Sequence, residues 1–180
     1  MTKRLIVTFF ASLFLISCNN DDPFAITSTS VGPLTQESTV NELETLFKDQ
    51  KVVSKTNPQG AKIGSDAIEI YENDAQLLSL KPKTDEKTST IKTIQIFDPR
   101  YKTEEGITLN STFKDIKNAY KISKIETLLT SIVVFVDDIN AYFTIDKKEL
   151  PSELQFDMSA KVDEVHIPDS AKIKYFMIGW

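Results

Sequence analysis

The 180-residue chain is poor in the residues that most often carry chemistry. It contains one cysteine, one histidine and five glycines. A single thiol cannot form an intramolecular disulfide, and one thiol with one imidazole cannot supply a usual zinc ligand set. No glycine-rich phosphate loop is present. The sequence therefore offers no metal or cofactor site, and we expect the hydrophobic core to provide the stability of the folded domain.

Candidate catalytic residues are equally few. His166 lies between Val165 and Ile167 in a predicted strand, and if those two side chains face the core, His166 points to solvent. Asp137 and Asp138 stand at a predicted hairpin tip, where acids are favoured as turn formers. We assign no catalytic residue. A carboxylate-based hydrolase stays open, because the acids of such enzymes pair in space and not in sequence.

Long apolar runs are also scarce, and the one that stands out lies at the start of the chain. Lys3 and Arg4 precede apolar and small residues from Leu5 to Ile16, a run too short to span a bilayer as a permanent helix. This pattern predicts a signal peptide over residues 1–17. Leu15-Ile16-Ser17-Cys18 resembles the bacterial lipobox, and the resemblance implies cleavage before Cys18 and acylation of that residue, with palmitate among the attached chains.

Residues 18–26 are expected to form a polar, lipidated tether. Its acidic start, Asn19-Asn20-Asp21-Asp22, resembles the surface-export signal of Bacteroidota lipoproteins, although a polar tether can be acidic without any export role. The lipidated protein is thus expected in the outer membrane, on its periplasmic face or at the cell surface. Loss of Lys3 and Arg4 leaves 19 basic and 26 acidic residues, a net charge of −7. This charge argues against nucleic acid and lipid headgroups as partners and leaves another envelope protein as the expected one.

The remaining residues, 27–180, are interpreted as one domain of two related halves, about 27–97 and 98–180. The segments Ser38–Lys48 and Ser111–Lys121 align, and each reads as a short amphipathic helix with a capping box. In the capping boxes Glu42 and Asp115 each stand three residues after a threonine.

Each predicted helix is followed by several predicted antiparallel strands. The expected strands are 51–54, 67–71, 75–80 and 90–97 in the first half, and 122–127, 132–136, 141–145, 161–167 and 172–178 in the second. The predicted fold class is α+β: a duplicated helix-plus-antiparallel-strands unit with helices packed on one face of the sheet or sheets. This plan resembles beta-lactamase inhibitor proteins and related outer-membrane assembly lipoproteins, although the disulfides of the inhibitor proteins are missing. The segment from Ile94 to Tyr120 is similar to small Bacteroidota lipoproteins of unassigned role.

Aromatic residues supply the candidate contact site. Tyr142 and Tyr175 each have an aromatic neighbour in a predicted strand, so one ring of each pair faces outward, and with Trp180 they are the candidates for a partner contact. The alternative for these rings is core filling. Asp169-Ser170-Ala171 resembles the Bacteroidota O-glycosylation motif, which makes Ser170 a candidate modification site.

Together these features predict a lipid-anchored binding or structural module of the outer membrane or cell surface, without catalysis. An inhibitor of an incoming enzyme and a carboxylate-based hydrolase are the alternatives. A concave sheet with outward aromatic rings favours a binding module or an inhibitor, whereas a deep pocket with two facing acids favours a hydrolase.

Overall fold

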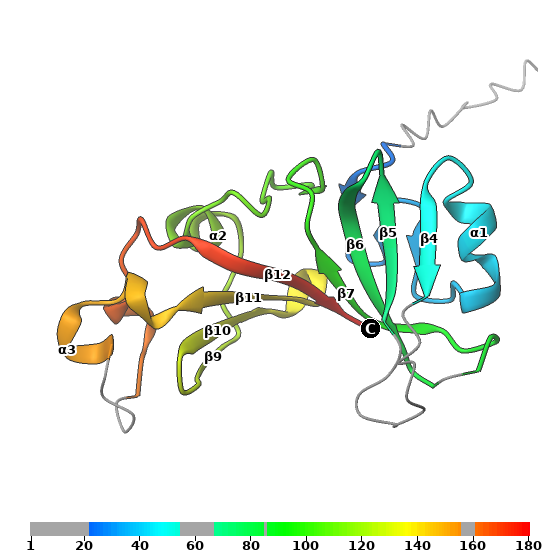
Figure 1. Ribbon diagram of the computed structural model, residues 1–180. Helices are drawn as coiled ribbons and strands as arrows, with labels where there is room; N and C mark the ends of the chain where they lie inside the picture. The colour runs from blue at the N-terminus through cyan, green and yellow to red at the C-terminus, as the bar shows by residue number, and fades with distance from the viewer. Residues whose placement is uncertain (1–21, 55–66, 85, 156–160) are drawn as a thin grey trace, which may run out of the picture.

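A twisted eight-stranded antiparallel sheet dominates the computed structural model (Figure 1), which describes residues 22–54, 67–84, 86–155 and 161–180. Its strand order is β4-β5-β6-β7-β12-β11-β10-β9, so β7 and β12 are the central pair and join strands β4–β7 to strands β9–β12. The bounds are β4 Lys51–Ser54, β5 Ile68–Glu72, β6 Ala75–Pro82, β7 Ile91–Ile96, β9 Lys124–Thr127, β10 Ser131–Val136, β11 Ala141–Asp146 and β12 Ile173–Gly179.

A second, smaller sheet is built from two-residue strands near the N-terminus. Its order is β3-β2-β1-β8, with antiparallel pairs except for β1 and β8, which run parallel. The strands are β1 Ala25–Ile26, β2 Ser30–Val31, β3 Leu34–Thr35 and β8 Lys102–Thr103. Ile26 lies within the predicted tether, yet it is fully buried. The folded part of the chain therefore starts earlier than residue 27.

Helical segments in the described residues are short. The longest is α2, Phe113–Ala119, and the others are α1 Leu43–Leu46, α3 Ser152–Gln155 and the 3₁₀ turns η1 Val40–Glu42, η2 Asp137–Ile139, η3 Lys147–Glu149 and η4 Glu164–His166. The predicted capping interactions are present at η1 and α2. The carboxylate of Glu42 accepts hydrogen bonds from the backbone and hydroxyl of Thr39, both at 2.8 Å, and Asp115 does the same for Thr112.

The core lies between one face of the large sheet and a layer formed by the small sheet, loops and the short helices. Register places Ile96 opposite Phe176, and Phe176 opposite Phe143, in the centre of that face. The rings of Phe143 and Phe176 are 4.6 Å apart. From the covering layer, the small sheet supplies residues such as Ile26 and helix α2 supplies residues such as Phe113, all fully buried.

The predicted fold class is wrong. The protein is mainly β, with a four-stranded and an eight-stranded sheet, and it is not a duplicated α+β unit with helices packed on one face of a sheet. The predicted helices do form, but η1 with α1 and α2 are too short to cover eight strands. The small sheet takes part of that role, and it escaped prediction because two-residue strands leave no measurable alternation in sequence.

One predicted strand is also wrong. Residues 161–167 contain the 3₁₀ turn η4, and Val165, expected in the core, is 88% exposed. The physical reason is local capping: the backbone N–H of Asp163 donates to Nδ1 of His166 at 3.1 Å, which closes a turn over these residues. Val162 and Ile167, which flank the turn, are buried.

The predicted hairpins are confirmed. β5 pairs with β6 and β10 pairs with β11, both antiparallel. Asn73 and Asp74 connect the first pair with φ of +47° and +67°, the left-handed conformation at both central positions that a two-residue hairpin turn favours. η2 and Asn140, with φ of +52°, connect the second pair.

Candidate binding face

The face of the large sheet that points away from the core carries a group of aromatic and thioether side chains. Register places Gln95 opposite Met177, Met177 opposite Tyr142, and Tyr142 opposite Phe135, so their side chains share one face. Each of these side chains is half-buried. This row crosses four neighbouring strands, β7, β12, β11 and β10.

Two further rings extend the row toward solvent. One position beyond the Ile96–Phe176 pair come Phe97 and Tyr175, which are 37% and 43% exposed. We refer to Phe97, Phe135, Tyr142, Tyr175 and Met177 as the aromatic face. Exposed aromatic side chains grouped on one surface are a common mark of a contact site.

Local contacts position the rings of the aromatic face. Phe135 and Tyr142 stack with centroids 5.8 Å apart and planes 25° apart. Gly179 lies directly beside Tyr142: a Cβ at this position would be 3.3 Å from the ring atom Cε1, so glycine leaves room for the ring. Burial raises the pKa of Tyr142, and a side-chain hydrogen bond with Thr93 acts in the opposite direction. The phenol is therefore neutral at physiological pH.

Lysine side chains border the aromatic face. Nζ of Lys124 is 5.7 Å from the ring centroid of Phe135, and Nζ of Lys174 is 5.6 Å from that of Tyr175. Lys174 also pairs with Asp146 at 3.0 Å, and Lys124 pairs with Glu126. The border is thus polar and its charges are largely paired, as at the rim of a protein interface.

Of the three contact residues predicted from sequence, two lie on the aromatic face and one packs against the core. Tyr142 and Tyr175 both lie on the aromatic face, on neighbouring strands and two residues out of register. Trp180 instead packs against the core, and its backbone N–H donates to the carbonyl of Lys92 at 2.8 Å. Phe97 was missed, because its exposure depends on where β7 ends. Cys18 lies outside the described residues.

The candidate modification site is exposed. Ser170 sits in a turn in which the N–H of Ala171 donates to the carbonyl of Pro168 at 3.0 Å. The preceding residue, Asp169, forms an ion pair with Lys117 of α2, and the hydrogen bond from this lysine lowers the pKa of Asp169. The motif is thus accessible, on a turn fixed to the helix.

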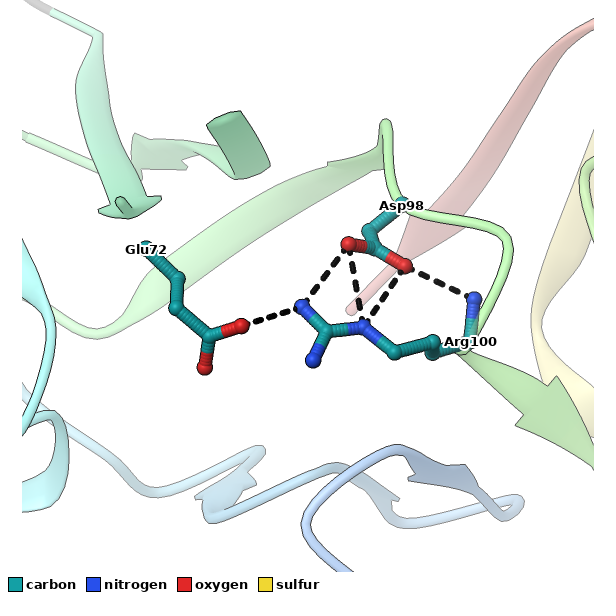
Figure 2. A network of polar contacts seen from close by, with 3 residues as sticks. All are labelled: Glu72, Asp98 and Arg100. Carbon is teal, nitrogen blue, oxygen red and sulfur yellow. Dashed lines mark hydrogen bonds and ion pairs between the residues drawn. The ribbon is translucent and has the colours of Figure 1, made fainter. Parts of the chain in front are cut away.

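A polar network that sequence reasoning missed joins Glu72, Asp98 and Arg100 (Figure 2). The guanidinium Nη2 of Arg100 lies 2.6 Å from Glu72 and 2.9 Å from Asp98, and Nε adds contacts of 3.1 and 3.2 Å to Asp98. The side-chain hydrogen bond from Arg100 lowers the pKa of Asp98. A carboxylate held ionised by a guanidinium is a poor proton donor, so this pair of acids is a structural link.

Several other acidic groups are held in their ionised form. Hydrogen bonds lower the pKa of a set of carboxyl groups, whereas a general acid requires a raised pKa. These groups are Glu42, Asp98, Asp115, Asp146 and Asp169. Across the described ranges, no three His, Cys, Asp or Glu side chains are grouped so that they could hold a metal ion. His166 is exposed, although it lies in the 3₁₀ turn η4 and not in the predicted strand, and Ser123 donates to Asp137 at 2.8 Å.

A pocket of another kind lies between η1, α1 and β4. It is lined by Val40, Leu43 and Val52 with polar residues such as Glu44 and Lys87. Ser54 of β4 and Ile68 of β5 complete the lining on the side of the large sheet. No helix in the described part of the chain is long and apolar enough to cross a membrane.

Comparison with known proteins supports the fold and leaves the function open. No protein-family model matches the chain, and no curated protein matches it. Among solved structures, it is similar to the crystal structure of the uncharacterized protein yfeY from Escherichia coli, with a TM-score of 0.58 and 11% sequence identity. The match covers 87% of this chain and 99% of that one. At this identity the likeness concerns the fold alone.

Proposed function

We propose that this protein is a lipid-anchored, non-catalytic binding module of the outer membrane, which contacts another envelope protein through the aromatic face. The observation that carries the proposal is the row of half-buried and exposed rings on the side of the large sheet opposite the core. Aromatic residues and methionine are enriched in protein interfaces, where they bury much area at low entropic cost. Asp98, whose pKa is lowered by its hydrogen bond with Arg100, is not suited to act as the general acid of a hydrolase.

Capture from envelope extract tests the contact. Tyr142→Ala and Tyr175→Ala should each reduce recovery of the partner by the loss expected for an interface anchor, about 1 to 4 kcal/mol of binding free energy. Val165→Ala is the matched control, because Val165 is an exposed apolar residue of η4 and lies outside the aromatic face. Equal capture by all three variants, with folding intact, would reject the aromatic face as the contact.

The anchor is tested separately. Cys18→Ser should abolish labelling by a fatty-acid analogue and release the protein from membranes. A Cys18→Ser protein that still fractionates with detergent-soluble membrane would contradict the lipid anchor.

An inhibitor of an exogenous enzyme would use the same face. The identity of the captured protein distinguishes an inhibitor from a module that binds another envelope protein. A hydrolase is the remaining alternative. Loss of a hydrolytic activity in His166→Ala or Asp137→Asn, with the fold unchanged, would overturn the binding function.

A further inference from the structure

The start of the described chain is fixed to the domain by contacts on several sides of Phe24. The ring of Phe24 packs under the guanidinium of Arg100, 4.2 Å from the ring centroid, and meets the ring of Tyr101 edge-on at 5.2 Å. Its backbone N–H donates to the Asp22 carboxylate, and its carbonyl accepts from the N–H of Lys102, both at 3.0 Å. Both the side chain and the backbone of Phe24 are thus held.

A close backbone contact secures the same segment from another direction. Gly32 has φ of +53°, and a Cβ at this position would stand 2.4 Å from the carbonyl oxygen of Pro23. The N–H of Gly32 donates to the carbonyl of Ala25 at 2.7 Å. Only glycine permits this approach, so residues 23–25 are pressed against the β2–β3 turn.

Arg100, which covers Phe24, is itself immobilised. Its ion pairs with Glu72 at the end of β5 and with Asp98 after β7 attach it to the large sheet (Figure 2). We call Phe24, Gly32, Glu72, Asp98, Arg100 and Tyr101 the N-terminal clamp. The clamp links the first described residues to the small sheet and to the large sheet at once.

The chain entry and the aromatic face lie on opposite sides of the large sheet. The chain enters through β1, part of the small sheet that covers the core face, whereas the aromatic face is on the other side. In Figure 1 the blue start of the described chain lies near the tip of the β5–β6 hairpin, away from β10 and β11.

We propose that the N-terminal clamp orients the domain on the membrane, with the small-sheet layer toward the lipid bilayer and the aromatic face toward a water-soluble partner. This inference rests on the proposed function, because it needs the lipid on Cys18. Three residues separate Cys18 from Asp22, and at about 3.6 Å per residue this stretch reaches about 14 Å at most. The bilayer surface must then lie within that distance of Asp22. The clamp fixes the residues that follow Asp22 to the domain, so they do not lengthen the tether.

Charge does not provide a competing way to orient the domain. The mature chain carries a net charge of −7, so its body is not attracted to anionic headgroups. Arg100, whose guanidinium lies over the Phe24 ring, is already paired with two acids. The short tether and the clamp therefore determine which side faces the lipid.

Quenching by spin-labelled lipid headgroups measures this orientation. The lipidated full chain is placed in vesicles of phosphatidylethanolamine and phosphatidylglycerol, with a fluorophore on Lys102→Cys or Lys81→Cys. Lys102 pairs with Ala25 in the small sheet and Lys81 lies opposite Thr93 on the far side of the large sheet, and both are exposed lysines. We expect the label at position 102 to be quenched several-fold more than the label at position 81.

Two changes should remove this difference. Phe24→Ala with Arg100→Ala opens the clamp, and a 20-residue Gly/Ser insertion after Asp21 lengthens the tether while the folded domain stays unchanged. Each should make quenching at the two positions equal. Equal quenching in the parent, or a difference that survives the insertion, would overturn the proposal.

The quenching experiment can fail without contradicting the proposed function, and partner capture can fail without contradicting the orientation. Partner capture in solution by the unanchored Cys18→Ser protein depends on the aromatic face and not on orientation. Capture together with equal quenching in the parent would refute the clamp alone. A lipidated chain that failed to stay with vesicles would refute the anchor and the orientation together.

Discussion

At the scale of single residues, Phe47 shows how much stability one core ring provides. Phe47 directly follows α1 as its C-terminal cap residue, and it is 3% exposed within the core cluster. Phe47→Ala removes most of the ring and leaves a cavity, so we expect a loss of about 3 to 5 kcal/mol in the free energy of unfolding. Urea denaturation followed by circular dichroism measures this loss. A change of less than 1 kcal/mol by the same measurement would place the ring outside the core.

Trp180 is the second residue with a specific expectation. It packs against the core, and its Nε1 is buried without a hydrogen-bond acceptor among the described residues. Trp180→Ala should lower stability by about 3 to 5 kcal/mol, whereas Trp180→Phe should cost clearly less, because phenylalanine keeps an aromatic ring and removes the unsatisfied donor. Thermal melts of the two variants give the comparison. A larger loss for phenylalanine than for alanine would contradict this packing.

At the scale of elements, the capping box of α2 is the interaction that the sequence predicted most directly. Thr112 precedes α2, and its N–H and hydroxyl both donate to Asp115 at 2.8 Å. The backbone hydrogen bond from Thr112 lowers the pKa of Asp115. Thr112→Ala should reduce stability by about 1 kcal/mol, the usual cost of losing an N-terminal cap.

The measurement for the cap is a denaturation midpoint, with Thr108→Ala as a control. Thr108 lies in the loop before α2. Its hydroxyl accepts a hydrogen bond from the backbone N–H of Asn110 and is not part of the cap. Equal midpoints for Thr112→Ala and the parent would show that the cap contributes nothing to stability.

At the scale of the whole molecule, the ionised acids predict a loss of stability in acid. Hydrogen bonds and ion pairs lower the pKa of Asp98, Asp146 and Asp169 in the folded protein. A group whose folded pKa lies below its unfolded value stabilises the fold fully above the unfolded pKa, about 3.9 for aspartate, and this stabilisation disappears as pH falls through the folded pKa. The melting temperature should therefore stay nearly level from neutral pH to about pH 5 and fall below about pH 4.

Asp98→Asn measures how much of the stability lost in acid comes from the ion pair between Asp98 and Arg100. The variant should melt below the parent at pH 7, where Asp98 pairs with Arg100, and the gap should close as Asp98 of the parent is protonated. Differential scanning calorimetry across pH provides both curves. A gap that stays constant down to pH 2 would mean that the ion pair does not couple to folding.

Local patterns were readable from sequence. The hairpins at Asn73-Asp74 and at Asp137-Asp138, and the capping boxes at Thr39 and Thr112, each depend on residues within a few positions of one another. Alternation or turn chemistry over so short a stretch acts before any tertiary contact forms. The outward direction of Tyr142 and Tyr175 followed from the same alternation.

Tertiary structure decided what distant segments do together. The small sheet joins residues 25–35 to Lys102 and Thr103, and the clamp joins Phe24, Glu72 and Arg100, so neither has a contiguous sequence signal. Tertiary contacts likewise placed Trp180 against the core and left Phe97 on the aromatic face. The sequence by itself determined the hairpins, the caps and the alternation of the strands, because these obey local sterics and hydrogen bonding. Which layer covers the large sheet, and which rings remain on its open face, depends on how segments far apart in the chain share one core.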